Sequence, residues 1–271
     1  MSNYKNKSGY YGNKNGDISG STEDNGGNDN VFIGRNAVLE LLKSGREIDK
    51  LYVQKGEREG SITLIVARAA ESRIPVVEVD KHRLDKMSAG GVHQGVAAIA
   101  SETAYVSVED ILAIAAERGE KPFIVICDSI NDPHNLGAII RTAECAGVHG
   151  VIIPKRRAVS VNGAAAKASA GAVFHMAVAR VSNLSSAMRT LRDNNVWIYA
   201  LESDGTPYYK SDFDCACAFV LGGENSGVTR LVRDNSDFVI SVPMYGKINS
   251  LNVSNAGAVV LFEAARQRTQ K

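Results

Sequence analysis

The sequence is poor in cysteine, in tryptophan and in net charge. Its 271 residues include four cysteines and one tryptophan, and 31 basic against 30 acidic residues leave a net charge of +1 at pH 7. So small a net charge creates no overall field toward a nucleic acid or a membrane, and a polyanion would have to be bound by a local patch. The cysteines show neither C-x-x-C spacing nor paired histidines nearby, which argues against a zinc site and a disulfide framework.

Long apolar runs are missing as well. No run reaches the roughly 18 residues of a membrane-spanning helix, and the N-terminus lacks the charged and apolar regions of a signal peptide. These absences lead us to expect a soluble, cytoplasmic protein with no membrane partner and no metal. Hydrophobic residues make up 44% of the chain, which at this length is enough for two packed domains and a tail.

Composition divides the chain into three parts. Of the first 30 residues, 17 are Gly, Asn or Ser, and such a segment cannot bury enough surface to offset its ordering entropy. We expect residues 1–30 to be a disordered, solubilising tail, with an RNA-binding arm as the alternative. Residues 31–105 predict a small α/β sandwich, with helices at 37–44 and 62–71, strands at 50–54 and 76–79, a final β-rich run, and a linker at 101–107.

Residues 106–271 predict a second α/β domain. Ser107 and Asp110 form a capping-box pattern ahead of a helix that runs to about residue 118. Apolar strands follow at 123–127, 151–153, 175–179, 196–201, 218–221 and 238–241, and helices at 136–146, 163–171, 184–193 and 251–268. Apolar strands separated by helices are typical of a parallel sheet covered on both faces. Ligands of such sheets bind beyond the carboxyl ends of the strands.

Three polar loops follow strands of the second domain, at residues 131–143, 219–228 and 242–256. Because parallel strands end at one edge of a sheet, these loops predict one shared ligand site. Glycines directly after an apolar strand, as at Gly222, let a ligand approach the backbone closely, with a plain turn as the alternative. Neither a phosphate-binding P-loop nor a G-x-G-x-x-G dinucleotide loop occurs in the chain.

Basic side chains near these loops indicate an anionic ligand. Arg141 follows Asn135 by six residues in a predicted helix, where its planar fork suits a phosphate or carboxylate; a surface ion pair with Glu144 is the alternative. Three consecutive basic residues after a strand end, Lys155, Arg156 and Arg157, are the best candidate for a polyanion contact, with a solvated surface as the alternative.

Taken together, the three loops resemble the signature motifs of SpoU-type RNA 2′-O-ribose methyltransferases. The motifs stand here as Asn135-Leu-Gly-Ala-Ile-Ile-Arg-Thr-Ala, as Val220-Leu-Gly-Gly-Glu-Asn-Ser-Gly, and as Val242-Pro-Met with Ser250-Leu-Asn-Val-Ser. The N-terminal half, with Gly34-Arg-Asn-Ala-Val and His93-Gln-Gly-Val-Ala, is similar to the ribosomal-protein-like substrate-binding domain of the family's 23S rRNA guanosine branch. The resemblance covers residues 31–268; Tyr245-Gly-Lys-Ile-Asn departs from the family's pattern.

The resemblance implies a fold, a cofactor and site residues. The fold is a parallel-sheet domain with a deep trefoil knot, which binds S-adenosylmethionine and forms a homodimer; ordinary connection rules exclude a knot, so it rests on the resemblance alone. The implied catalytic residues are Asn135, Arg141, Glu224, Ser250 and Asn252. The implied cofactor contacts come from Leu201, Gly222, Gly223, Val242 and Leu251.

The implied reaction is methylation of a ribose 2′-hydroxyl in RNA, with a guanosine of 23S rRNA as the expected target. We expect Arg141 to hold the flanking phosphate, because a guanidinium stays protonated and is a poor base, and Glu224 to orient Arg141 or Asn252. The small domain and Lys155 to Arg157 would bind the RNA. The alternatives are a tRNA 2′-O-methyltransferase, an adenosine-methylating resistance enzyme, a non-catalytic RNA-binding or assembly factor, and a generic nucleotide-binding protein.

Overall fold

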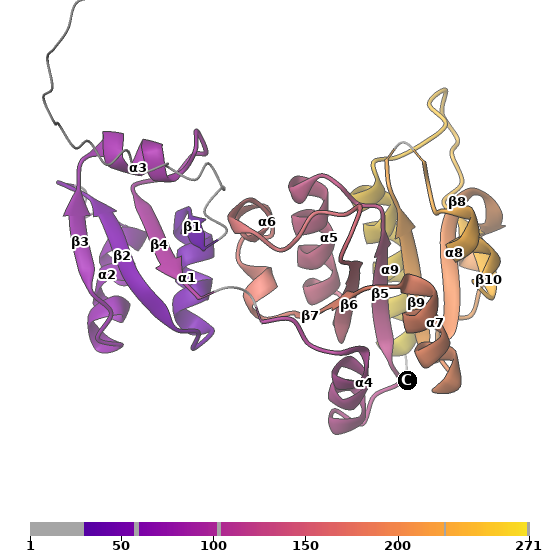
Figure 1. Ribbon diagram of the computed structural model, residues 1–271. Coiled ribbons are helices and arrows are strands. Elements are labelled where there is room, and N and C mark those ends of the chain that lie inside the picture. Colours follow the sequence, from indigo (N-terminus) through magenta and orange to yellow (C-terminus); the bar gives the residue numbers. More distant parts are fainter. Residues whose placement is uncertain (1–29, 57–59, 102–103, 225, 270–271) are drawn as a thin grey trace, which may run out of the picture.

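The computed structural model describes residues 30–56, 60–101, 104–224 and 226–269. The tail predicted for residues 1–30 therefore lies outside the described residues, apart from Asn30. Two α/β domains lie side by side (Figure 1), the N-terminal one in indigo and magenta and the C-terminal one in magenta to yellow. No helix in the described part of the chain has the length and apolar character that crossing a membrane requires.

The N-terminal domain is a four-stranded sheet with helices on both faces. Strands β1 (Val31–Ile33), β2 (Ile48–Gln54), β3 (Val76–Val79) and β4 (Val96–Ala100) pair in the order β1-β4-β2-β3, with β2 and β3 parallel and the other pairs antiparallel. Helices α1 (Arg35–Lys43) and α2 (Ser61–Glu71) pack into the main core, whereas α3 (Lys81–Met87) packs into a separate cluster through Leu84. The predicted sandwich is confirmed. Helix α3 was not predicted, because Leu84 is its one buried residue.

The C-terminal domain contains six parallel strands, as predicted. They are β5 (Phe123–Asp128), β6 (Gly150–Pro154), β7 (Ala177–Val181), β8 (Trp197–Pro207), β9 (Cys217–Gly222) and β10 (Phe238–Ser241), in the order β10-β8-β9-β5-β6-β7. Strands β5 and β9 are buried at every residue, since they are central and covered on both faces. The trefoil knot implied by the resemblance stays a prediction.

Two layers of helices cover this sheet. One layer is α4 (Val108–Glu117), α7 (Leu184–Asp193) and α8 (Arg230–Asp234); the other is α5 (Pro133–Cys145), α6 (Gly163–Ala168) and α9 (Val253–Thr269). The capping box that starts α4 is confirmed, because Ser107 Oγ accepts from Asp110 N and the Asp110 carboxylate accepts from Ser107 N at 2.8 Å.

One stretch between α6 and β7 differs from the prediction. The helix predicted to reach residue 171 ends at Ala168, and the strand predicted from His175 begins at Ala177. Ala170 and Gly171 both have positive φ, which stops the α-helix and turns the chain into a 3-10 helix, η1 (Ala172–Phe174).

The two domains share a packed interface. The Phe32 and Phe174 rings meet edge to face at 5.2 Å, and the Arg46 guanidinium lies 5.4 Å from the Phe174 ring centre. His175 Nε2 lies 2.9 Å from Glu40 Oε2. The expected linker is also docked where the structure describes it, because Tyr105 Oη accepts a hydrogen bond from Val161 N at 3.1 Å. The N-terminal domain is therefore fixed against the sheet domain.

Candidate functional site

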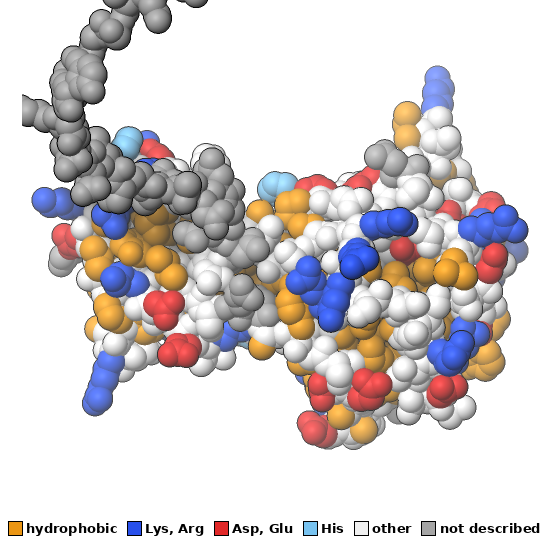
Figure 2. All heavy atoms as spheres, viewed as in Figure 1, with side chains coloured by type: hydrophobic (Ala, Val, Ile, Leu, Met, Phe, Trp, Pro, Cys, Tyr) orange, Lys and Arg blue, Asp and Glu red, His pale blue; other side chains and the backbone are white. Residues whose placement is uncertain are grey.

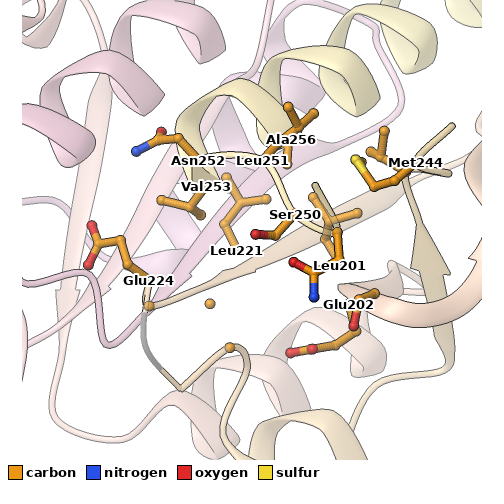
Figure 3. A pocket seen from close by; sticks show the side chains of 16 residues that line it. Leu201, Glu202, Leu221, Glu224, Met244, Ser250, Leu251, Asn252, Val253 and Ala256 are labelled. Carbon is orange, nitrogen blue, oxygen red and sulfur yellow. The ribbon is translucent and has the colours of Figure 1, made fainter. Parts of the chain in front are cut away.

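A cavity of about 520 Å³ lies at the carboxyl ends of β8, β9 and β10. Figure 3 shows it from close by, with Glu224 and Glu202 on opposite sides and Ser250 between them. Its lining comes from residues 201–203, 221–224 and 227 and from several residues between 242 and 256, so two of the three predicted polar loops form most of its wall. The volume falls in the range of about 300–1,000 Å³ that is usual for small-molecule sites.

One wall is an excursion in strand β8. The register with β10 shifts between Val239, opposite Ala200, and Ile240, opposite Thr206. The intervening residues 201–205 have no partner in β10, although Leu201 still pairs with Leu221 of β9, and Leu201, Glu202 and Ser203 line the cavity. The Glu202 carboxylate accepts a hydrogen bond from Val228 N at 2.5 Å, which ties this wall to the loop after β9.

The loop after β9 needs its glycines. A Cβ on Gly222 would lie 2.1 Å from the Gly227 carbonyl carbon, and one on Gly223 would lie 2.6 Å from Ser129 O. Gly227 has φ +61° and donates to Gly223 O at 2.9 Å, which closes the turn. The buried Asp128 carboxylate accepts from Thr229 N at 2.7 Å and holds the far side of this loop. The glycines thereby let the loop fold tightly against its own backbone and against Ser129.

The loop between β10 and α9 closes the cavity from the other side. Helix α9 begins at Val253, two residues later than predicted, because Asn252 acts as its cap: Asn252 Oδ1 accepts from Ser254 N at 2.9 Å. Leu251 and Asn252 therefore precede the helix. Val242, Ser250, Leu251 and Asn252 all line the cavity.

A directed chain of polar side chains lies at the cavity's edge. Asn252 Nδ2 donates to Asn135 Oδ1 at 3.0 Å, and Asn135 Nδ2 donates to the Glu224 carboxylate. The orientation of the Asn252 amide is fixed because its oxygen caps α9. Asn135 is placed by the first turn of α5, where Asp132 Oδ1 accepts from His134 N at 3.0 Å. Glu224 thus contacts Asn135, which joins it to Asn252, and the expected role of Glu224 in orienting Arg141 or Asn252 stays a prediction.

Arg141 lies outside the lining of the cavity. It is about 9 Å further along α5 than Asn135 and roughly 240° around the helix, on the exposed side. The alternative of an ion pair with Glu144 is not realised, because no such contact within 4 Å is found between these two described residues. Its charge acts on Cys145, where it opposes the rise in thiol pKa that burial causes.

The predicted RNA-binding residues Lys155, Arg156 and Arg157 follow β6, two strands from β9 on the same edge of the sheet. All three are exposed, and none forms an ion pair with another described residue. Lys and Arg side chains gather on the face of the C-terminal domain seen in Figure 2. These residues keep a free positive charge beside the site.

The structure brings together nearly all the predicted residues. Leu201, Gly222, Gly223, Val242 and Leu251 line the cavity with Glu224, Ser250 and Asn252, and Asn135 joins them by hydrogen bonds. Glu202, Met244 and Asn249 also line it and were not predicted. Glu202 directly follows the predicted strand 196–201, and an acidic residue at a strand's carboxyl end was the available signal. No group of three metal-ligating side chains is found in the described part of the chain.

Comparison with known proteins gives two matches to family models. Residues 122–262 match the SpoU rRNA Methylase family, and residues 31–106 match the RNA 2′-O ribose methyltransferase substrate-binding family. A TrmH family tRNA/rRNA methyltransferase, described as putative, of Bacillus subtilis (strain 168) is 39% identical over 237 residues, which is 87% of this chain and 95% of the relative.

Solved structures agree on the fold. A SpoU methyltransferase from Streptomyces viridochromogenes in complex with AdoMet has a TM-score of 0.74 at 22% identity, covering 89% of this chain and 91% of that one. An AdoMet-bound rRNA methyltransferase from Sinorhizobium meliloti has a TM-score of 0.72 at 26% identity, covering 87% and 86%. A TrmH/SpoU tRNA modifying enzyme from A. aeolicus, with a TM-score of 0.50 at 27% identity, covers only 59% of this chain and 84% of its own.

The cavity, its glycine loop and the polar chain beside it thus occur in a chain whose two halves match the two parts of an RNA-methylating enzyme. The expected resemblance is confirmed at the level of the family, and with it the α/β fold and the N-terminal substrate-binding domain. The chain belongs to the SpoU rRNA methylase family of RNA methyltransferases.

Proposed function

We propose that this enzyme transfers a methyl group from S-adenosylmethionine to the ribose 2′-hydroxyl of a guanosine in 23S rRNA. The observation that carries the proposal is the chain Asn252–Asn135–Glu224 at the edge of the glycine-walled cavity. It places oriented amides and a carboxylate beside a small-molecule site in a chain that also has an RNA substrate-binding domain.

The cavity residues fit S-adenosylmethionine. The apolar side chains of Leu201, Leu221 and Leu251 offer surface to an adenine ring, and the backbone of Gly222 lines the cavity beside them. The carboxylates of Glu202 and Glu224 lie on opposite sides and suit the cationic groups of the cofactor. The bound cofactor supplies an electrophilic methyl group on a sulfonium.

The remaining work of the protein is alignment. Methyl transfer is an in-line displacement, so the ribose has to be held at a fixed distance and angle from the donor. The S–CH3 bond breaks as the O–CH3 bond forms, S-adenosylhomocysteine leaves, and the hydroxyl proton goes to water or to the flanking phosphate. We propose that Ser250 and Asn252 hold the ribose and that Glu224 acts through Asn135 to keep the Asn252 amide in place. Arg141, outside the cavity on the exposed side of α5, is proposed to hold the phosphate next to the target nucleotide.

The N-terminal domain supports rRNA over tRNA as the substrate. The A. aeolicus tRNA modifying enzyme covers 59% of this chain, whereas the S. meliloti rRNA methyltransferase covers 87% and so spans both domains. We propose that this domain and the side chains of Lys155, Arg156 and Arg157 bind the RNA backbone. An enzyme that acts on rRNA works where ribosomes are assembled, and we expect it in the cytoplasm.

We further propose a homodimer through the sheet domain. Helices α5 and α9 lie next to each other, and Phe262 of α9 is 51% exposed. The proposal rests on the resemblance to SpoU-type methyltransferases, whose knotted domains form dimers, and the Phe262 ring is available to such a contact. Sedimentation that shows a fully active monomer would contradict this proposal.

The function is tested by incubating the purified protein with S-adenosylmethionine and unmodified 23S rRNA, and mapping 2′-O-methylation by protection from alkaline cleavage. We expect one protected guanosine. With Arg141→Ala we expect no protection, while the affinity for S-adenosylmethionine in calorimetry stays within a few-fold. Equal loss of cofactor binding and activity would refute the role given to Arg141.

The other outcomes separate the alternatives. Methylation of tRNA without methylation of rRNA would support the tRNA enzyme. Cofactor binding without methylation of any RNA would support a non-catalytic factor. Failure to bind S-adenosylmethionine would contradict the use of this cavity.

A further inference from the structure

The loop between β10 and α9 carries exposed aromatic and basic side chains beside the cavity. Both ends of this loop line the cavity, through Val242 and Met244 on one side and Asn249 on the other. Between them Tyr245 is 88% exposed and Ile248 is 74% exposed. In Figure 1 the loop, coloured gold, projects from the carboxyl edge of the sheet.

A second exposed tyrosine comes from a neighbouring strand. The register pairs Ser241 of β10 with Pro207 of β8, so the residues after both strands emerge side by side. The residues after Pro207 form the 3-10 helix η2 (Tyr208–Lys210), in which Tyr208 packs against the core and Tyr209 is 53% exposed. The rings of Tyr208 and Tyr209 meet at 5.5 Å, nearly perpendicular. The Tyr208 ring therefore supports the exposed Tyr209 ring on the side that faces the core.

The two exposed tyrosines lie close enough to influence each other's ionisation, as the pairing of Ser241 with Pro207 leads one to expect. The interaction with Tyr209 raises the pKa of the Tyr245 hydroxyl. Tyr209 thus links the loop tip to the sheet, although the two residues lie 36 positions apart in the sequence. We call Tyr209, Tyr245, Lys210 and Lys247 the tyrosine rim.

The charge of the tyrosine rim is positive. Lys210 and Lys247 are exposed, and neither forms an ion pair with another described residue. The acidic residues nearest to Lys210 along the chain have other partners: Asp212 Oδ1 accepts from Asp214 N, and Asp214 pairs with Lys121 at 2.9 Å. Proteins that bind single-stranded nucleic acids combine exposed aromatic rings with free lysines, because bases stack on the rings and phosphates bind to the charged groups.

We propose that the tyrosine rim binds the unpaired bases that flank the target nucleotide, with Tyr245 and Tyr209 as stacking surfaces and Lys247 and Lys210 on the adjacent phosphates. This inference rests on the proposed function, because it takes the ligand to be RNA whose 2′-hydroxyl enters the cavity. The rim shares a loop with the cavity wall, so a nucleotide at the cavity mouth has its neighbours within reach of the rim. Stacking tolerates any base, so the rim would contribute affinity for unpaired RNA rather than sequence choice.

The test compares wild type with Tyr245→Ala, Tyr245→Phe and Tyr245→Leu on unmodified 23S rRNA. We expect Tyr245→Ala to raise KM for RNA about tenfold or more, with the affinity for S-adenosylmethionine unchanged in calorimetry. Phenylalanine keeps the ring and should restore the wild-type KM, whereas leucine keeps apolar area without a ring and should not. The matched control is Trp197→Ala, which removes an aromatic residue of similar exposure, 51%, at the amino end of β8 and should leave KM unchanged.

A second readout separates failure of the rim from failure of the proposed function. A short single-stranded RNA with 2-aminopurine should lose fluorescence on binding wild type or Tyr245→Phe, and keep it with Tyr245→Ala. An unchanged KM in Tyr245→Ala, or a wild-type KM in Tyr245→Leu, would overturn the tyrosine rim as a base-stacking site. A change in oligomeric state in Tyr245→Ala would also overturn it, because the rim would then be a contact with a second copy of the chain. A wild-type enzyme that methylates no RNA would sink the proposed function, and the fluorescence result would then decide the inference alone.

Discussion

At the scale of single residues, the site depends on positions where no side-chain atom is tolerated. Gly222 faces the backbone of Gly227 so closely that a Cβ would lie 2.1 Å from its carbonyl carbon. Backbone cannot move aside as a flexible side chain can, so the turn itself would have to open. The geometry of the glycine loop and the shape of the cavity are therefore coupled.

We predict that Gly222→Ala removes cofactor binding and lowers the free energy of unfolding by about 1–3 kcal/mol, through overpacking. Calorimetry with S-adenosylmethionine and urea unfolding would measure the two effects. Gly246→Ala is the matched control, because a Cβ there meets nothing within 4 Å. Full cofactor affinity in Gly222→Ala would show that the loop is not part of the cofactor site.

A buried histidine gives a pH dependence at the same scale. His149 Nδ1 accepts from Phe123 N at 3.0 Å, and Nε2 lies 3.0 Å from Glu120 Oε2. Burial is the largest influence on this group and lowers its pKa, and Glu120 opposes that shift only in part. The folded state therefore binds the proton less well than the unfolded state, whose pKa is about 6.5.

We predict that stability is complete above about pH 6.5 and falls as the pH is lowered through that value toward the folded pKa. The measurement is the urea midpoint between pH 7.5 and 5.5. His149→Asn should reduce the slope of the midpoint against pH in this range, because it removes the titrating group. An unchanged slope in the variant would assign the pH dependence to other groups.

At the scale of elements, helix α4 has its start fixed by two reciprocal hydrogen bonds. Ser107 Oγ accepts from Asp110 N at 3.1 Å, and the Asp110 carboxylate binds both the backbone and the hydroxyl of Ser107. The helix then buries Val108, Ile111 and Ala115 against the sheet. The cap sets where the helix begins, and the apolar spacing sets which face is buried.

We predict that Ser107→Ala lowers the free energy of unfolding by about 1 kcal/mol, because the backbone N–H of Asp110 loses its acceptor. Ser107→Thr retains the hydroxyl and should cost less. Denaturant unfolding of both variants measures the difference. A larger loss in threonine than in alanine would contradict the capping role.

At the scale of the whole molecule, the two domains behave as one packed body. One hydrophobic core cluster contains Phe32 of the N-terminal domain and Phe123 of the C-terminal domain, and Phe174 of the same cluster packs edge to face on Phe32 at the interface. This arrangement fixes the substrate-binding domain relative to the cavity. An RNA that contacts both the substrate-binding domain and the cavity is then positioned by this interface.

We predict that wild type unfolds in a single thermal transition and that Phe174→Ala separates it into two, with a loss of about 3–5 kcal/mol. Scanning calorimetry measures this. Phe213→Ala removes a fully buried ring within the C-terminal domain and should lower the transition temperature without splitting the transition. Equal splitting in both variants would contradict an interface role for Phe174.

The sequence by itself determined the local structure and the inventory of the site. The alternation of apolar strands with helices predicted the parallel sheet, and Ser107 and Asp110 predicted the start of α4. The resemblance carried by the three polar loops implied nine residues that now line the cavity or bind its polar side chains, eight of them in the loops and Leu201 at the end of the predicted strand 196–201. These features depend on neighbours within a few residues along the chain, so their signals are present in short windows.

Only the tertiary structure decided which of these residues meet. Glu224 reaches Asn135 across 89 positions and Arg141 stays outside the cavity. The excursion in β8 adds Glu202, and the pairing of Ser241 with Pro207 brings Tyr209 beside Tyr245. Such contacts follow from the order and register of the strands, and a short window of sequence does not encode the register between strands that are far apart in the chain.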